Sequence, residues 1–207
     1  MSFELWFSFT LASLAILAIP GPTVILVVGY ALGQGRRTGL ATVPGVVLGD
    51  FTAMTVSLLG AGAVLATSAT LFTALKLIGA AYLVWLGISL WRAPVQATSD
   101  AAVPASRRST WSLFANAYVV TALNPKGIVF FVAFVPQFVV ADAPVLPQFA
   151  LLEATFLFLA AINAAAWAYA AGRFNGAFQS LALRRLVNRV GGSFLCAAGA
   201  LTAMARQ

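Results

Sequence analysis

The sequence of 207 residues contains no histidine and a single cysteine, Cys196. Histidine and cysteine are the usual ligands of zinc, and a disulfide within the chain needs two cysteines. A zinc site that needs several of these ligands and a disulfide within the chain are therefore excluded. The sequence also carries no cofactor fingerprint and no strong nucleophile elbow. We expect no cofactor, no metal centre and no enzymatic activity.

Charge is equally scarce. Only 8% of the residues are charged and 61% are hydrophobic, whereas a soluble domain averages about 25% charged and roughly 45–50% apolar residues. The mean hydropathy is +0.95. A soluble fold of this length cannot bury so much apolar surface, so the composition predicts an integral membrane protein embedded in a lipid bilayer. The net charge of +7 then needs no nucleic-acid partner, because the basic residues lie mainly at the ends of apolar stretches.

Six apolar stretches meet or approach the roughly 20 residues that a helix needs to cross about 30 Å of hydrocarbon. They lie at Leu5–Leu32, Leu40–Ala66, Leu71–Trp91, Trp111–Val140, Pro147–Gly172 and Val190–Ala205. The last is the shortest. The expected fold is all-α, with six transmembrane helices in a single transmembrane domain over residues 1–207.

Arginine is concentrated in three of the predicted loops, 33–39, 92–110 and 173–189. The nine arginines near these loops are Arg36, Arg37, Arg92, Arg107, Arg108, Arg173, Arg184, Arg185 and Arg189. Cytoplasmic loops are enriched in Lys and Arg. We therefore expect these three loops to be cytoplasmic and both termini to lie outside.

The polar linker 92–110 divides the chain into repeat 1, about residues 1–91, and repeat 2, about residues 111–207. Pro20 of the first span aligns with Pro125 of the fourth, and Asp50 and Glu153 follow these prolines by 30 and 28 residues. A repeat of three spans has an odd number of crossings, so the two copies have opposite topology, as in many secondary transporters. Chance matching in a chain rich in Gly, Ala and Leu is the alternative, but the motifs recur in the same order.

The prolines predict that helices 1 and 4 are broken or kinked near the middle of the membrane, because proline removes a backbone hydrogen bond. The second half of each helix then starts with free N–H groups and the positive end of its dipole, which suit a carboxylate. A purely structural kink is the alternative. The residues predicted to bind substrate are Pro20, Gly21, Pro22, Thr23, Asn124, Pro125, Lys126 and Gly127.

Three ionisable residues lie within predicted spans, where a charge costs about 2.5–3.5 kcal/mol on insertion scales. Lys126 must pair, lose its proton or line a wet cavity, and Asp50 and Glu153 are its candidate partners. Asp50 is the principal candidate for proton coupling and Glu153 a weaker one, because burial favours the neutral form of a carboxyl group. A structural ion pair is the alternative. Asn163 adds a polar group at comparable depth.

Glycine spacing predicts where helices pack closely. Gly45 and Gly49 are four residues apart directly before Asp50, and Gly79 and Gly87 lie in the third span. Glycine lets neighbouring backbones approach. Similar glycine faces can pack within one chain or between the chains of a homo-oligomer, so a homo-oligomeric state stays open.

These motifs resemble the lysine-exporter/homoserine-threonine-efflux (LysE/Rht) family of bacterial inner-membrane amino-acid exporters. The resemblance covers the chain up to about Phe138. It is carried by Pro20-Gly21-Pro22, Gly45-x3-Gly49-Asp50, Gly79-Ala80-Ala81-Tyr82-Leu83-x3-Gly87, Asn124-Pro125-Lys126 and Pro136-Gln137-Phe138. The resemblance implies an inner-membrane protein that exports basic or neutral amino acids in exchange for protons.

The resulting hypothesis is secondary-active export by alternating access around a site between the repeats. The substrate carboxylate would meet the half-helix N-termini and Lys126, and its ammonium would meet Asp50. Two alternatives remain. A divalent-cation exporter would use the oxygens of Asp50, Glu153 and Asn163, although a lysine beside them would repel the ion. A non-transporting membrane assembly protein would have no evident need for buried charges.

Overall fold

The structure is a computed structural model, and it describes residues 1–93, 109–140, 143–173 and 181–204. Within these ranges every regular element is helical. The elements are α1 (Phe3–Ala18), α2 (Pro22–Gln34), α3 (Arg36–Ala41), α4 (Val43–Thr67), α5 (Ala69–Arg92), α6 (Thr110–Ala122), α7 (Pro125–Val129), the π-helix η1 (Phe130–Phe134), the 3-10 helix η2 (Val135–Phe138), α8 (Val145–Arg173) and α10 (Leu181–Met204). Apart from its two ends, the predicted linker 92–110 lies outside the described residues.

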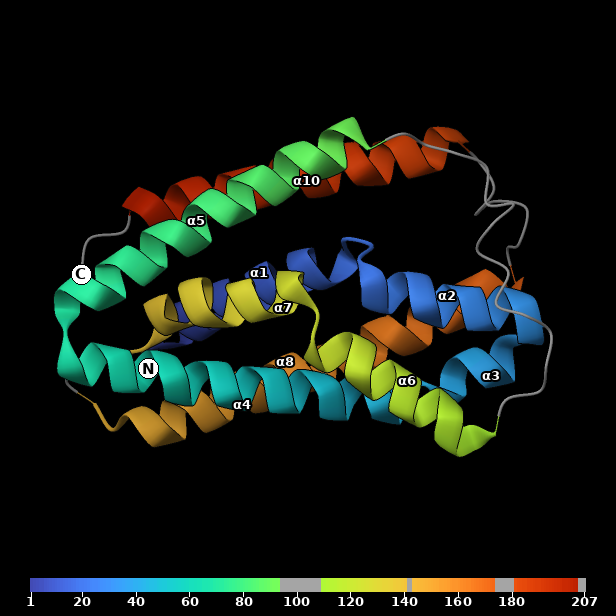
Figure 1. Cartoon of the computed structure of the whole chain (residues 1–207), viewed down its shortest axis with the longest axis horizontal. Helices are drawn as coiled ribbons and strands as arrows, with labels where there is room; N and C mark the ends of the chain where they lie inside the picture. The colour runs from blue at the N-terminus through green and yellow to red at the C-terminus, as the bar shows by residue number, and fades with distance from the viewer. Residues whose placement is uncertain (94–108, 141–142, 174–180, 205–207) are drawn as a thin grey trace.

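The helices run back and forth along the long axis of the molecule (Figure 1). The segments α1–α2, α4, α5, α6–α7, α8 and α10 follow one another in alternating directions, so α1 begins and α10 ends at the same end of the molecule. The pair α5 and α10 lies along one edge, packed side by side. The broken helices α1–α2 and α6–α7 lie deeper, against α4 and α8.

By length and composition, two helical segments of the described chain can cross a membrane, namely Arg36–Ala63 and Val145–Ala171. Two bent pairs raise this number to four if each pair forms one span. The apolar part of α5, Leu77–Arg92, is shorter. The structure therefore supports two to four candidate spans, where the sequence predicted six. Helix α10 starts at Leu181, before the predicted start of the sixth apolar span at Val190, because the arginine-bearing segment in front of the span is also helical.

Both predicted helix breaks are present. The axes of α1 and α2 differ by 53°, and those of α6 and the segment Pro125–Phe138 by 42°. Pro22 and Pro125 each occupy the first turn of the second half-helix, behind the N-caps Gly21 and Asn124. Proline suits that position because its missing N–H would have had no acceptor there. Pro22, rather than the Pro20 that the sequence aligned with Pro125, thus occupies the same helix position as Pro125.

The second broken helix changes its winding after α7. Pro136 cannot donate a backbone hydrogen bond, and the helix around it passes from π to 3-10 geometry. The Gln137 side chain donates to the Ala133 carbonyl oxygen at 2.9 Å. This winding keeps the rings of Phe130 and Phe134 in contact, at 5.1 Å between centroids, in the core beneath the break.

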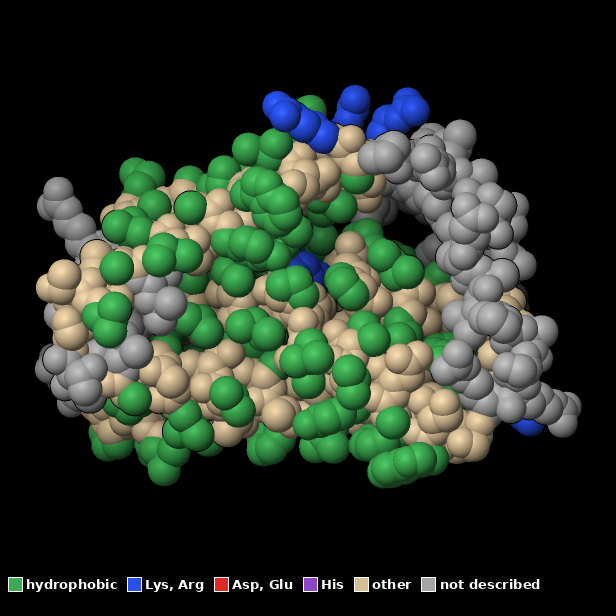
Figure 2. Space-filling view, in the orientation of Figure 1, with side chains coloured by type: hydrophobic (Ala, Val, Ile, Leu, Met, Phe, Trp, Pro, Cys, Tyr) green, Lys and Arg blue, Asp and Glu red, His purple; other side chains and the backbone are tan. Residues whose placement is uncertain are grey.

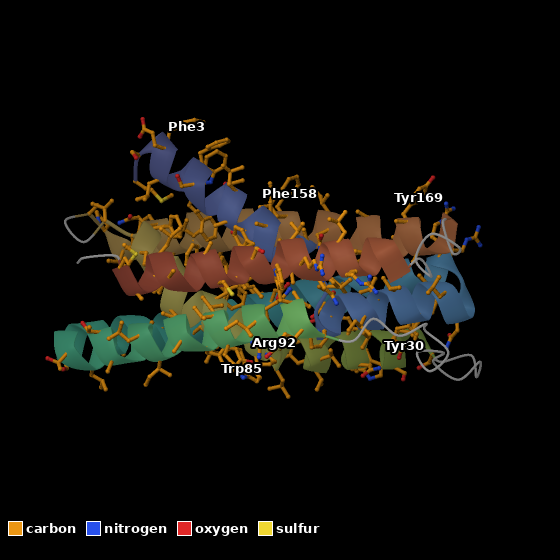
Figure 3. All side chains as sticks on the ribbon, turned by 90° about the horizontal axis from the view of Figure 1, so that it is seen from above. Phe3, Tyr30, Trp85, Arg92, Phe158 and Tyr169 are labelled. Atoms are coloured by element: carbon orange, nitrogen blue, oxygen red, sulfur yellow. The ribbon has the colours of Figure 1, made fainter. Side chains whose placement is uncertain are left out.

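The outer surface is apolar. Figure 2 shows hydrophobic side chains spread over the visible face of the bundle. Phe3, Trp85 and Phe158 point away from the bundle in Figure 3 and are 70%, 59% and 66% exposed. Exposed aromatic and aliphatic groups on this scale are unfavourable in water and suit a lipid environment.

Three helix pairs approach closely at glycine. A Cβ on Gly45 of α4 would overlap the carbonyl oxygen of Phe114 in α6, and one on Gly49 would lie 2.8 Å from the carbonyl oxygen of Tyr118. On α5, a Cβ on Gly87 would lie 2.6 Å from the carbonyl oxygen of Gly192 in α10. A Cβ on Gly79, also in α5, would overlap Ala133 of η1. Each added methyl group would meet backbone or a tightly packed side chain.

We expect Gly45→Ala to lower the thermal stability of the protein purified in detergent, because the methyl group would push α4 and α6 apart. Overpacking of this kind costs about 1–3 kcal/mol. The matched control is Gly60→Ala on the same helix, where a Cβ meets nothing within 4 Å and helix propensity gains roughly 1 kcal/mol. Equal melting temperatures for the two variants would contradict this packing.

Candidate functional site

A cavity of about 40 Å³ lies where the two helix breaks meet α4 and α8. On this measure a water molecule needs roughly 10–15 Å³, so the cavity holds a few waters. Polar and apolar residues both line it. They are Ile16, Leu17, Gly21, Thr23, Val24, Val27, Val46, Asp50, Asn124, Lys126, Gly127, Phe130, Phe156, Ala160, Asn163 and Ala164.

The Lys126 ammonium caps the C-terminal end of α1. Its Nζ donates to the carbonyl oxygens of Ile16 at 2.9 Å and Ile19 at 2.7 Å. The last carbonyls of a helix lack intrahelical donors and carry the negative end of the dipole, so a cation is favoured there. Of the two candidate partners predicted for Lys126, Asp50 interacts with it electrostatically, whereas Glu153 does not line the cavity. Carbonyl oxygens of the broken helix accept its hydrogen bonds.

Asn163 of α8 supports the same helix end. Its Nδ2 donates to the carbonyl oxygen of Leu17 at 3.1 Å. Three carbonyls at the end of α1 therefore receive donors from side chains on two other helices. These bonds satisfy backbone groups that water cannot reach from within a bilayer.

Gly21 provides the space through which the lysine reaches α1. A Cβ at Gly21 would lie 3.3 Å from Cε and 3.4 Å from Nζ of Lys126. These separations are tighter than ordinary van der Waals contact. The absence of a side chain at Gly21 thus lets Lys126 lie against the first break.

A chain of hydrogen bonds connects the two breaks. The Asn124 Oδ1 accepts from the backbone N–H of Lys126 at 3.1 Å, and the Asn124 Nδ2 donates to Thr23 Oγ1 at 3.2 Å. Thr23 Oγ1 also lies 3.2 Å from Thr121 Oγ1. Asn124 is at once the N-cap of α7 and a cross-link to α2, which fixes the separation of the two half-helices.

Asp50 of α4 faces the cavity and is 8% exposed. Within the described residues no group donates a hydrogen bond to its carboxylate, and its electrostatic partner is Lys126. An anion that is buried without donors is strongly destabilised. The carboxylate is therefore available to a ligand ammonium group, to water or to a proton.

The N-terminal turn of α2 contributes backbone donors. The first intrahelical hydrogen bond runs from Ile25 N–H to the Gly21 carbonyl, so the N–H groups of Thr23 and Val24 have no acceptor within the helix. Both residues line the cavity, as does Gly127 in the first turn of α7. These positions suit a carboxylate near the positive end of the α2 dipole.

The structure sorts the predicted site residues into two groups. Gly21, Thr23, Asn124, Lys126, Gly127 and Asp50 line the cavity, whereas Pro20, Pro22, Pro125 and Glu153 do not. The prolines shape the breaks.

Glu153 belongs to a separate polar contact. It accepts a hydrogen bond from Thr55 Oγ1 at 2.6 Å. Asp50 and Glu153 are thus not brought into one cavity, which separates the carboxylate pair that the cation-exporter alternative requires.

Some contributors had no recognisable sequence signal. Ile16 and Leu17 take part through backbone carbonyls, which every residue possesses. Thr121 is one of many threonines, and its role depends on the turn that precedes Asn124. For Asn163 the sequence indicated only a depth within the predicted span comparable to that of the ionisable residues.

We expect Lys126→Met to destabilise the protein, because the capped carbonyls of α1 would lose their donors. An unsatisfied buried polar group costs about 1–3 kcal/mol. Thermal unfolding of the purified protein measures the effect. The control is Thr10→Val, which removes a side-chain hydrogen bond to the Trp6 carbonyl oxygen within the regular part of α1 and should cost little. An unchanged melting temperature for Lys126→Met would show that α1 does not need this cap.

Comparison with known proteins places the chain in a family. The model of the LysE type translocator family matches residues 14–206, well beyond Phe138, where the recognisable motifs end. The homoserine/homoserine lactone efflux protein of Salmonella typhimurium is 32% identical over 206 residues, covering 100% of this chain and 99% of the relative. An uncharacterized membrane protein of Vibrio cholerae is 32% identical over 208 residues, covering 100% of both chains.

A leucine efflux protein of an Enterobacter species is 31% identical over 139 residues, covering 67% of this chain and 65% of the relative. No solved structure matches the chain. The family model and the full-length relatives together span nearly every residue. The chain is therefore a membrane protein that belongs to the LysE type translocator family.

Proposed function

We propose that the protein exports amino acids by alternating access around the cavity between its two broken helices, in exchange for protons. Family membership supports a transporter rather than an enzyme. The relatives named for efflux of homoserine, homoserine lactone or leucine support an amino-acid substrate.

One observation carries the proposal: a buried carboxylate, which no described residue supplies with a hydrogen-bond donor, lies in the same small cavity as a partly buried ammonium. A free amino acid carries one positive and one negative group. Lysine has three N–H donors, and two of those on Lys126 are used by α1. The third, with the N–H groups of Thr23 and Val24, would hold the substrate carboxylate, and Asp50 would accept the substrate ammonium.

Asp50 also supplies a means of proton coupling. When the substrate ammonium leaves, the carboxylate remains in a low-dielectric cavity where none of the described residues donates a hydrogen bond to it. Protonation removes that unfavourable charge. Export of one amino acid would then alternate with inward passage of a proton on Asp50. Glu153 is the weaker candidate because it lies outside the cavity and is bonded to Thr55.

Two features support an inverted repeat of three plus three spans. Counted from the prolines that open the second half-helices, Asp50 and Glu153 each lie 28 residues further along the chain. A shift of 112 positions carries Ala80 onto Gly192 and Gly87 onto Gly199. A Cβ on Gly87 would lie 2.6 Å from the Gly192 carbonyl oxygen, and the symmetric counterpart, a Cβ on Gly199, would lie 2.7 Å from the Ala80 carbonyl oxygen. This reciprocity is expected of a pseudo-two-fold axis between α5 and α10.

The orientation follows from the ends of the helices. Arg36 and Arg37 open α3, Arg92 closes α5, and Arg185 and Arg189 lie in the first turns of α10. The alternating course of the helices brings these ends to the same half of the molecule (Figure 1). We assign this end to the cytoplasm and both termini to the outside of the inner membrane.

Alternating access requires the cavity to open toward one side of the membrane at a time. The breaks at residues 19–21 and 123–124 are the natural hinges, because backbone there is already released from the helical hydrogen-bond pattern.

We expect Asp50→Asn to abolish export driven by a proton gradient while the protein stays in the membrane, because the amide cannot carry the proton. The matched control is Glu153→Gln, which makes the same chemical change outside the cavity and should retain most of the export. Export from dipeptide-fed cells, with membrane content measured in parallel, tests both variants. Undiminished export by Asp50→Asn, or equal loss in both variants, would contradict the role of Asp50.

A further inference from the structure

Exposed arginines gather where α5 ends and α10 begins. Figure 2 shows basic side chains together over this end of the helix pair. We define the α5–α10 basic patch as Arg92, Arg185 and Arg189, all of which are exposed. Arg185 and Arg189 are one helical turn apart, so their side chains leave the same face of α10, with about 5–6 Å between their Cβ atoms.

Close helix packing builds this patch. A Cβ on Gly192 would lie 2.5 Å from the Gly87 carbonyl oxygen and 2.7 Å from Cδ1 of Trp91. The Trp91 Nε1 donates to Ser193 Oγ at 2.9 Å, which fixes the indole against α10. The Arg189 guanidinium carbon lies 5.4 Å from the centroid of the Trp91 ring, within the reach of about 6 Å that is typical of cation–π contacts. Arg92 follows Trp91 directly in the chain.

The described residues supply no acidic counterpart to the patch. Their carboxylates are Glu4 on α1, Asp50 at the cavity and Glu153 beside Thr55. Three neighbouring positive charges repel one another, and an external anion removes that repulsion. Guanidinium groups bind phosphate through paired, charge-assisted hydrogen bonds.

Apolar side chains adjoin the arginines on the same helices. Leu186 and Val190 of α10 are 59% and 62% exposed, and Trp85 and Ile88 of α5 are 59% and 41% exposed. Tryptophan with one polar edge is typical of the membrane–water interface. A phospholipid would place its charged headgroup on the arginines and its acyl chains on the adjoining apolar side chains, whereas a soluble phosphate would contact only the arginines.

We propose that the α5–α10 basic patch binds the phosphodiester headgroup of an anionic phospholipid, with the acyl chains along the apolar surface of the two helices. The site is separate from the cavity and does not depend on the transport proposal. In the orientation assigned above it faces the inner leaflet.

The test is native mass spectrometry of the full chain in uncharged detergent, with phosphatidylglycerol and phosphatidylcholine of identical acyl chains added in equal amounts. The wild type should retain phosphatidylglycerol in preference. Each basic residue near an anionic surface contributes on the order of fivefold in affinity, so Arg185→Gln with Arg189→Gln should reduce the preference by about tenfold or more. The matched control, Arg36→Gln with Arg37→Gln, removes the same charge elsewhere and should keep the preference.

A further variant separates loss of the site from loss of folding. Arg185→Lys with Arg189→Lys retains the charge and should keep at least part of the preference, and all variants should elute as the same species in size-exclusion chromatography. Equal lipid preference in every variant, or equal loss in both glutamine pairs, would overturn the proposal. Displacement of phosphatidylglycerol by millimolar glycerophosphate would also overturn it, because the site would then recognise soluble phosphate.

Discussion

The site depends on one interaction, the contact of the Lys126 ammonium with the end of α1. A helix that stops inside a membrane leaves carbonyl groups that water cannot satisfy. Lys126 supplies hydrogen bonds to Ile16 and Ile19, and the positive charge meets the negative end of the helix dipole. The same contact gives a buried lysine a reason to stay charged at this depth. The lysine thus satisfies the free carbonyl groups of the broken helix, and these carbonyl groups stabilise the charge of the lysine.

The remaining features of the site follow from this contact. Gly21 has no side chain, so Lys126 can lie against the break. Asn124 holds the backbone of Lys126 and reaches Thr23 on the other broken helix, so the two breaks are fixed as one unit. Asp50 faces the resulting cavity without a donor of its own. A cavity that offers one cation, one anion and free helix N–H groups matches the two charged groups shared by all amino acids.

Much of this arrangement could be predicted because it has causes in single residue types. Prolines in apolar spans predicted both breaks, and Gly45 and Gly87 lie at close helix approaches. The hydrogen-bond acceptors of Lys126 could not be predicted. They are backbone carbonyl oxygens, which every residue has and which are free to accept such a bond only where a helix ends. Sequence alone does not tell which proline of Pro20-Gly21-Pro22 opens the second half-helix, and the structure shows that it is Pro22. The exclusion of Glu153 from the cavity depends on helix rotation, which spacing from a proline does not fix.

The central claim is that the substrate occupies the cavity between the breaks, and accessibility of a single thiol tests it most directly. Cys196 is the sole cysteine, so Thr23→Cys in a Cys196→Ala background places one reporter on the cavity wall. We expect leucine or homoserine to slow its modification by a small, membrane-impermeant thiol reagent. Modification of Ser2→Cys, at the exposed start of α1, should gain no protection. An unchanged rate of modification at position 23 with every amino acid tested would contradict the claim.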